Sequence, residues 1–183
     1  MNPAVSTLRA ILNPRSVAVI GASGDPAKFG GRVMHFLVKH GYRGRIVPVH
    51  PSATAVLGIP AVSKLAAGDP VDVCILALPA AHLPAALEDC GRAGARGAVV
   101  ITADFAETGA AGAARQDELL QIARSHGMRL IGPNCLGFIN PQLQLALTSS
   151  VALAVEPMPR GAIGLASQSG SLMASLISHA QDL

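Results

Sequence analysis

A glycine-rich stretch near the N-terminus has the residue types that bind phosphate. It is Gly21-Ala22-Ser23-Gly24-Asp25-Pro26, which follows an apolar run and precedes an amphipathic segment. At such a position backbone N–H groups and a helix N-terminus can hold an anion, and glycine lets the backbone approach it closely. Ser23 can add a hydroxyl donor. A tight turn without a ligand is the alternative interpretation of this loop.

A second stretch of small polar residues is Ser167-Gln168-Ser169-Gly170-Ser171, between another apolar run and another helical segment. Hydroxyl and N–H groups would converge there at a helix N-terminus, which makes it a second candidate anion site. The same serines could instead cap the helix with no ligand bound. The residues alone leave both interpretations open.

His50-Pro51-Ser52 stands at the end of the second expected strand. A dinucleotide-binding protein ordinarily has Asp or Glu at this position to bind the ribose hydroxyls. The missing carboxylate makes NAD a weaker candidate and favours a ligand with a phosphorylated ribose. A 3′-phosphate could accept hydrogen bonds from His50 or Ser52.

Asn134 is the polar candidate in the stretch 131–137, which follows the fifth expected strand. The adjacent Cys135 has no His or acid in a recognisable partner motif, so we expect a packing thiol there. Together with Cys74 and Cys90 it makes three widely spaced cysteines, which indicate neither a zinc site nor a disulfide framework. The sequence predicts no metal site and favours a reducing interior.

Strands that alternate with helices must position these loops. Apolar runs that end at turn residues predict strands, and amphipathic segments between them predict helices. A continuous apolar strand such as 73–78 is typical of a parallel sheet covered on both faces. We therefore expect an α/β fold with an open, doubly wound parallel sheet. The expected strands are 16–20, 45–49, 71–78, 97–102 and 128–131, and the expected helices are 28–40, 80–93 and 112–126.

Helical periodicity fades after residue 140, and prolines recur up to residue 160. We place one domain at 1–140, a linker at 141–160 and the start of a second domain at 161–183. The second domain would hold a strand at 162–166 and a helix at 172–179. One such unit cannot bury its own faces, so we expect it to pack on the first domain, a partner or a continuation of the chain.

Composition excludes several classes of protein. The chain has 183 residues, of which 50% are hydrophobic and 14% charged, enough for one good core. The net charge of +3 comes from scattered Lys and Arg residues without interleaved aromatics, so nucleic acid is not expected. No stretch is apolar enough for a signal peptide or a membrane span, which predicts a cytoplasmic protein.

Several stretches in order resemble one family. They are 16–23 (SVAVIGAS), 105–109 (FAETG), 131–137 (IGPNCLG) and 166–170 (ASQSG). Together they are similar to the nucleoside-diphosphate-forming acyl-CoA synthetases, the superfamily of the succinyl-CoA synthetase alpha subunit. Each motif is weak alone, but the ordered set is specific and covers nearly the whole chain.

The resemblance implies a Rossmann-like CoA-binding domain followed by a flavodoxin-like ligase domain with a phosphorylated histidine. An ATP-grasp domain or beta subunit would bind ATP and Mg, and a small carboxylic acid would be converted with CoA and ATP into acyl-CoA, ADP and phosphate. A homo-oligomer is left open. By position, the CoA contacts would be Gly21, Ala22, Ser23, Gly24, Asp25, Pro26, His50, Pro51, Ser52, Leu78, Pro79, Ile101, Thr102, Ala103 and Asn134, and the phosphate contacts Ser167, Gln168, Ser169 and Gly170.

Two positions depart from the family pattern. Ser52 stands where the family often has Lys or Arg, and Asp104 stands where glycine is usual. The family's catalytic histidine would lie beyond residue 183, so no catalytic residue is assigned and this chain alone is expected to be inactive. The alternatives are a stand-alone CoA-binding regulatory module, which would be expected to finish its second sheet, and an NAD(P)-binding Rossmann protein, which His50 disfavours.

Overall fold

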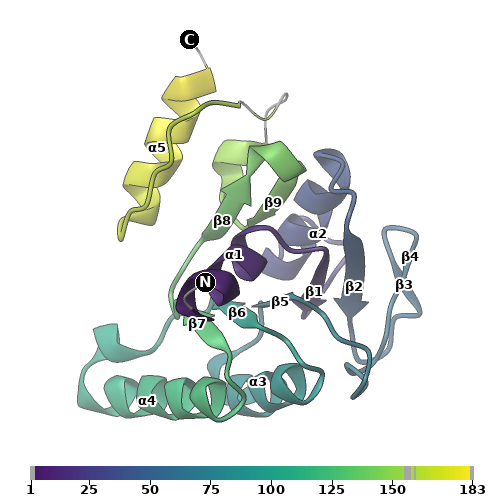
Figure 1. Ribbon diagram of the computed structural model, residues 1–183, viewed down its shortest axis with the longest axis vertical. Coiled ribbons are helices and arrows are strands. Elements are labelled where there is room, and N and C mark those ends of the chain that lie inside the picture. The colour runs from purple at the N-terminus through teal and green to yellow at the C-terminus, as the bar shows by residue number, and fades with distance from the viewer. Residues whose placement is uncertain (1–2, 155–157, 159, 182–183) are drawn as a thin grey trace.

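The computed structural model describes residues 3–154, 158 and 160–181 (Figure 1). Its main sheet has five parallel strands in the order β2-β1-β5-β6-β7, which confirms the predicted parallel α/β sheet. Most strands are shorter than or equal to the apolar runs that predict them. Their bounds are Ser16–Ile20 for β1, Arg45–Val49 for β2, Val73–Leu76 for β5, Gly97–Val100 for β6 and Arg129–Ile131 for β7.

Helices cover both faces of the sheet (Figure 1). One face packs against α3 and α4 and the other against α1 and α2, with a separate apolar cluster on each side. Side chains of β5 alternate between the clusters, since Cys74 belongs to the first and Val73 and Ile75 to the second. Every residue of β5 is therefore buried. The helices are α1 Pro3–Leu12, α2 Phe29–Lys39, α3 Leu83–Arg92 and α4 Ala110–Ser125.

The amino edge of the sheet is fixed by the Asp72 carboxylate. It accepts hydrogen bonds from the N–H groups of Arg15 (2.7 Å) and Ser16 (3.3 Å). Close by, the Tyr42 hydroxyl donates to the carbonyl of Pro14 at 2.8 Å and is buried. Burial, and then the Asp72 charge, raise the pKa of Tyr42 to about 12.

Two short hairpins flank the main sheet. The pair β3 Ala55–Val56 and β4 Ile59–Pro60 lies beside β2. The pair β8 Gly137–Asn140 and β9 Leu145–Thr148 packs on α2. The second pair runs into the range 141–160 that we expected to be a linker. Leu145 and Leu147 are fully buried there, and so is Leu153 further on, so the packed unit continues to at least that residue.

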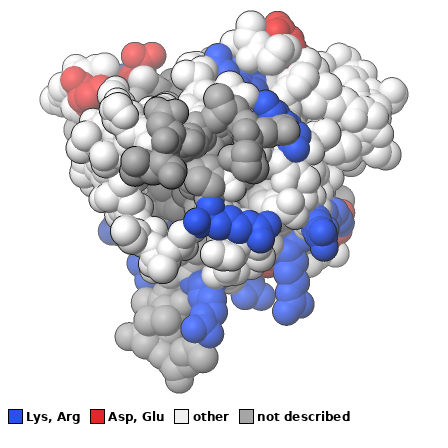
Figure 2. Space-filling view, turned by 90° about the horizontal axis from the view of Figure 1, so that it is seen from above, with Lys and Arg blue, Asp and Glu red and all other residues white. Residues whose placement is uncertain are grey.

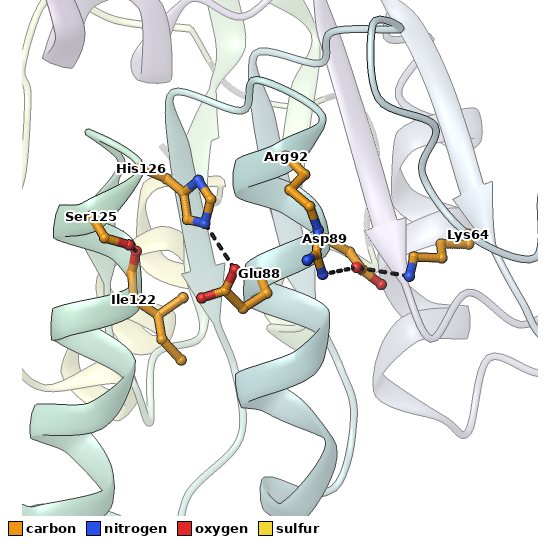
Figure 3. Close-up of polar contacts among 7 residues, drawn as sticks. All are labelled: Lys64, Glu88, Asp89, Arg92, Ile122, Ser125 and His126. Carbon is orange, nitrogen blue, oxygen red and sulfur yellow. Dashed lines mark hydrogen bonds and ion pairs between the residues drawn. The ribbon is translucent and has the colours of Figure 1, made fainter.

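Helices α3 and α4 are joined by polar and steric contacts (Figure 3). The ring of His126, just after α4, lies 2.9 Å from a carboxylate oxygen of Glu88 on α3. A Cβ at Gly91 would collide with the same ring. Asp89, also on α3, pairs with Arg92 and Lys64. These contacts stabilise the face opposite α2.

The C-terminal segment differs from its prediction. The predicted strand 162–166 is wrong, because these residues form no regular secondary structure. Ile163 is 94% and Leu165 55% exposed, and among the described residues no strand pairs with them. A strand needs a neighbour for its N–H and C=O groups. The fold therefore shows no flavodoxin-like unit.

Helix α5, Gly170–Gln181, follows this segment and begins two residues before the predicted start. It lies outside the main sheet, beyond the β8–β9 hairpin (Figure 1). Ile177 packs against a small cluster that contains Phe36 and Leu153. No helix in the described part of the chain is long and apolar enough to cross a membrane.

Candidate functional site

The order in which the chain adds strands to the sheet reverses between β1 and β5. The chain passes from β1 through α2 to β2 on one side, and β5, β6 and β7 follow on the other. Open α/β sheets bind ligands at the carboxyl edge beside such a point, because the helices that follow the two adjacent strands lie on opposite faces of the sheet. All the predicted site residues of the first domain lie in loops that follow parallel strands.

The glycine loop after β1 is held close to the loop after β5. Gly21 has a φ of +84°, and a Cβ there would lie 2.5 Å from the carbonyl oxygen of Ala77. Glycine is therefore required for both its backbone conformation and its packing. Gly24, in contrast, is exposed, and a Cβ there would meet nothing within 4 Å. The loop thus contains one glycine that packing explains and one that it does not.

Gly30 and Gly31 help to position the glycine loop, and the sequence analysis missed them. A Cβ on Gly30 would collide with the carbonyl of Gly21, and one on Gly31 with the carbonyl of Asp25. The first turn of α2 can lie against the loop only because both side chains are absent. Two adjacent glycines inside an expected helix were the available signal, because glycine weakens a helix and such a position often has a packing reason.

Hydrogen bonds within the glycine loop fix its shape. The Ser23 hydroxyl oxygen accepts from the N–H of Asp25 at 3.1 Å, which leaves its own proton free to donate. The Asp25 carboxylate accepts from the N–H of Ala27, and the His35 ring binds the carbonyl of Gly24. In the described part of the chain, the N–H groups of Ser23 and Gly24 have no hydrogen-bond partner.

His50 has a defined tautomer. Its Nδ1 accepts hydrogen bonds from the N–H groups of Ser52 (3.2 Å) and Ala53 (2.9 Å). Because Nδ1 is an acceptor, the neutral ring carries its proton on Nε2, which is left as a donor. Pro51 and Ser52 are exposed beside it. The structure therefore puts a donor at the end of β2.

The loops after β5, β6 and β7 are connected to one another. The Thr102 hydroxyl donates to the carbonyl of Leu78 at 2.6 Å, and the N–H of Asn134 donates to the carbonyl of Thr102 at 2.9 Å. Pro79, Ala103 and Asn134 are exposed along this line, whereas Ile101 is buried. The Thr102 hydroxyl proton is already used within the chain.

Asp104 has a φ of +77°, a conformation that favours glycine. Its N–H donates to the carboxylate of Glu107, and its carbonyl accepts from Arg115. Hydrogen bonds from backbone N–H groups, with Arg115 as a smaller contribution, lower the pKa of Glu107. Glycine would adopt this left-handed backbone without strain.

The second anion candidate, residues 167–171, lies at the start of α5. The Ser169 hydroxyl accepts from the N–H of Leu172 at 3.2 Å, and the Ser167 hydroxyl accepts from the N–H of Ser169. Ser169 therefore caps α5, as one of the two interpretations predicts. Gly170 lies against Leu136, which places the start of α5 next to the loop after β7.

The cysteines have packing roles in the structure. Cys74 and Cys90 are fully buried, and a hydrogen bond from the Cys74 thiol to Cys90, followed by burial, raises the pKa of the Cys74 thiol. Cys135 is half-buried and its sulfur accepts from the N–H of Gly137. Among the described residues, no group of His, Cys, Asp and Glu could hold a metal ion.

Comparison with known proteins defines the family. A family model described as a CoA binding domain matches residues 15–141. The chain belongs to this family, in the branch found in ADP-forming acyl-CoA synthetases, as the ordered motifs predicted.

Three relatives show how far the similarity extends. The chain is 39% identical to acetate–CoA ligase (ADP-forming) I of Archaeoglobus fulgidus, over 90% of this chain and 23% of the relative. It is also 39% identical to the alpha subunit of acetate–CoA ligase (ADP-forming) II of Pyrococcus furiosus, over 90% of this chain and 35% of that subunit. A solved structure from Pyrococcus horikoshii OT3 matches with a TM-score of 0.86 and 36% identity, over 94% of this chain and 38% of that one. The chain thus spans a minor part of each of these relatives.

Proposed function

We propose that this chain binds CoA at the carboxyl edge of its sheet and is the CoA-binding portion of an ADP-forming acid–CoA ligase. The observation that carries the proposal is the open space around Gly24. Gly24 is exposed, has open space where a side chain would be, and has an N–H without a partner in the described residues. Packing within the chain does not account for this glycine, whereas the approach of a phosphate group does.

The CoA diphosphate would lie over the glycine loop. The free N–H groups of Ser23 and Gly24 and the Ser23 hydroxyl are donors there. The N-terminus of α2 adds a favourable dipole beside the same loop. Asp25 and Pro26 form the outer, exposed part of the loop. These groups would bind and orient CoA rather than react with it.

The adenosine end would lie near the end of β2. The Nε2 proton of His50 and the exposed Ser52 are available to a 3′-phosphate, and no carboxylate stands there to repel it. The pantetheine arm would then extend along the connected loops after β5, β6 and β7. That path contains Leu78, Pro79, Ile101, Thr102, Ala103 and Asn134.

The ligase reaction needs parts beyond the CoA site. In the proposed reaction a small carboxylic acid, CoA and ATP give acyl-CoA, ADP and phosphate, with ATP and Mg bound by an ATP-grasp domain or beta subunit. Exposed apolar side chains in the C-terminal segment support packing against such a partner, because Ile163, Leu165 and Leu172 are all more than half exposed. We infer that residues 161–183 begin the ligase domain and that residues 167–170 bind phosphate there.

Calorimetric titration with CoA, dephospho-CoA and NAD tests the proposal. We expect CoA to bind more tightly than NAD. Gly24→Val should weaken CoA binding at least about tenfold, or ~1.4 kcal/mol, because its side chain would occupy the space of the phosphate. Since that space is empty in the chain, the variant should fold normally. Tighter binding of NAD than of CoA would refute the proposal.

A further inference from the structure

Arg32 lies in the first turn of α2, directly after the glycine loop, and is partly buried. Its Nη1 donates to the backbone carbonyl of Ser149 at 3.0 Å. Its guanidinium carbon lies 5.7 Å from the centre of the Phe29 ring. These two contacts hold the guanidinium group in place on the side of α2 that faces the β8–β9 hairpin.

The charge of Arg32 has no counter-charge within the described residues. No carboxylate there forms an ion pair with it, and Asp25, the acid of the adjacent loop, accepts from the N–H of Ala27 instead. A guanidinium group has five N–H donors, and only one has a partner here. A partly buried charge normally has a partner, so an anion would be favourable at this position.

A second polar group close to Arg32 also lacks a partner. The hydroxyl of Ser149 is buried and makes no hydrogen bond in the described part of the chain. The N–H of Ser149 donates to the carbonyl of Leu136, just after the loop that follows β7. Strand β9 thus returns the chain to the carboxyl edge of the sheet. Several Lys and Arg side chains are visible on the end of the molecule shown in Figure 2, and most of the visible Asp and Glu atoms lie at its rim.

We propose that Arg32 binds the diphosphate of CoA together with the free N–H groups of the glycine loop. This inference rests on the CoA binding proposed above. Arg32 faces β9, as its bond to Ser149 shows, whereas His50 and Ser52 follow β2 on the other side of β1. The diphosphate therefore fits Arg32 better than the 3′-phosphate does. A guanidinium group also matches phosphate oxygens in a bidentate geometry.

A purely structural role is the competing explanation. Lys39 and His40 also donate from the end of α2 to backbone carbonyls, those of Ala154 and Leu153. Arg32 could in the same way only hold the segment after β9 on the helix. The test must therefore separate charge from packing.

The experiment measures CoA and dephospho-CoA binding by calorimetry over a series of KCl concentrations. It compares the unchanged protein with Arg32→Met, which keeps an apolar stem, and Arg32→Lys, which keeps the charge. The matched control is Arg43→Met, since Arg43 is exposed and precedes β2 at the opposite edge of the sheet. Thermal unfolding of each variant reports on packing.

We expect Arg32→Met to weaken CoA and dephospho-CoA equally, by about tenfold or more, and to reduce the dependence of Kd on KCl. Arg32→Lys should lose less, and Arg43→Met nothing. Unchanged affinity in Arg32→Met, a loss for CoA but not dephospho-CoA, or equal losses in both Arg32 variants with the same KCl dependence would each overturn the inference. If the unchanged protein does not bind CoA, the proposed function itself fails.

Discussion

Tyr42 makes the stability of this fold depend on pH in a window that can be calculated. Its pKa is raised from 10.0 to about 12 in the folded protein, first by burial and then by the charge of Asp72. Between these values the unfolded chain releases the phenolic proton while the folded chain keeps it. The unfolded state then binds fewer protons, so stability must fall as the pH rises from 10 to about 12.

The magnitude follows from the shift. Each pH unit in the window costs up to about 1.4 kcal/mol, which gives at most about 3 kcal/mol in all. Tyr42→Phe removes the titrating group and also the 2.8 Å hydrogen bond to Pro14, worth about 1 kcal/mol. Below pH 10 the unchanged protein should therefore be the more stable of the two. The order should reverse near pH ~11, where the lost proton-linked stability exceeds the hydrogen bond.

Two measurements check this prediction. Urea unfolding at a series of pH values gives the free energy of unfolding of both proteins, and other titrating groups cancel in their difference. Phenolate absorbance of the folded protein gives the pKa of Tyr42 directly, because the chain has one Tyr and no Trp. A phenolate midpoint near 10 in the folded protein, or two parallel stability curves with no reversal, would refute the reasoning.

Four further substitutions test the packing of the glycines and the backbone conformation of Asp104. Gly30→Ala should destabilise the protein by about 1–3 kcal/mol or more in urea unfolding, because its Cβ collides with the carbonyl of Gly21, and it should also weaken CoA binding. Gly24→Ala is the control and should leave the unfolding midpoint unchanged. Asp104→Gly should stabilise the protein by about 0.5–1 kcal/mol in thermal unfolding, since φ is +77° there, and a lower midpoint would contradict this. Gly91→Ala should displace the ring of His126 and cost about 1–3 kcal/mol, whereas an unchanged midpoint would show that the ring moves freely.

The main sheet could be predicted from the sequence because its signals are local. Each strand is an apolar run that ends at a turn residue, as in 16–20 before Gly21 and 45–49 before His50. Because the strands are parallel, the loops that follow them must all lie at the carboxyl edge of the sheet. The strand ends were predicted less accurately. The run 71–78 extends beyond β5, because Ala77 and Leu78 are also apolar and pack against the core clusters after the last ladder pair.

Features that depend on distant contacts could not be predicted in this way. Strand β9 is buried because it packs on α2, which lies about a hundred residues earlier in the chain, and four residues carry too little periodicity to reveal it. The helix α1, Pro3–Leu12, was missed altogether. Conversely, residues 162–166 have a strand-like composition, but they form no strand, and no strand in the described part of the chain pairs with them.

The glycines of the candidate site show why structure changes the functional argument. Glycine lets a ligand or a neighbouring segment approach the backbone, and Gly21, Gly24, Gly30 and Gly31 all lie in or beside the glycine loop. In the structure a carbonyl of this chain fills the Cβ position of three of them, and only at Gly24 is that position empty. Three of these glycines are therefore explained without any ligand. The proposal of a bound phosphate depends on Gly24, and a single substitution at that residue can test it without disturbing the packing of the other three.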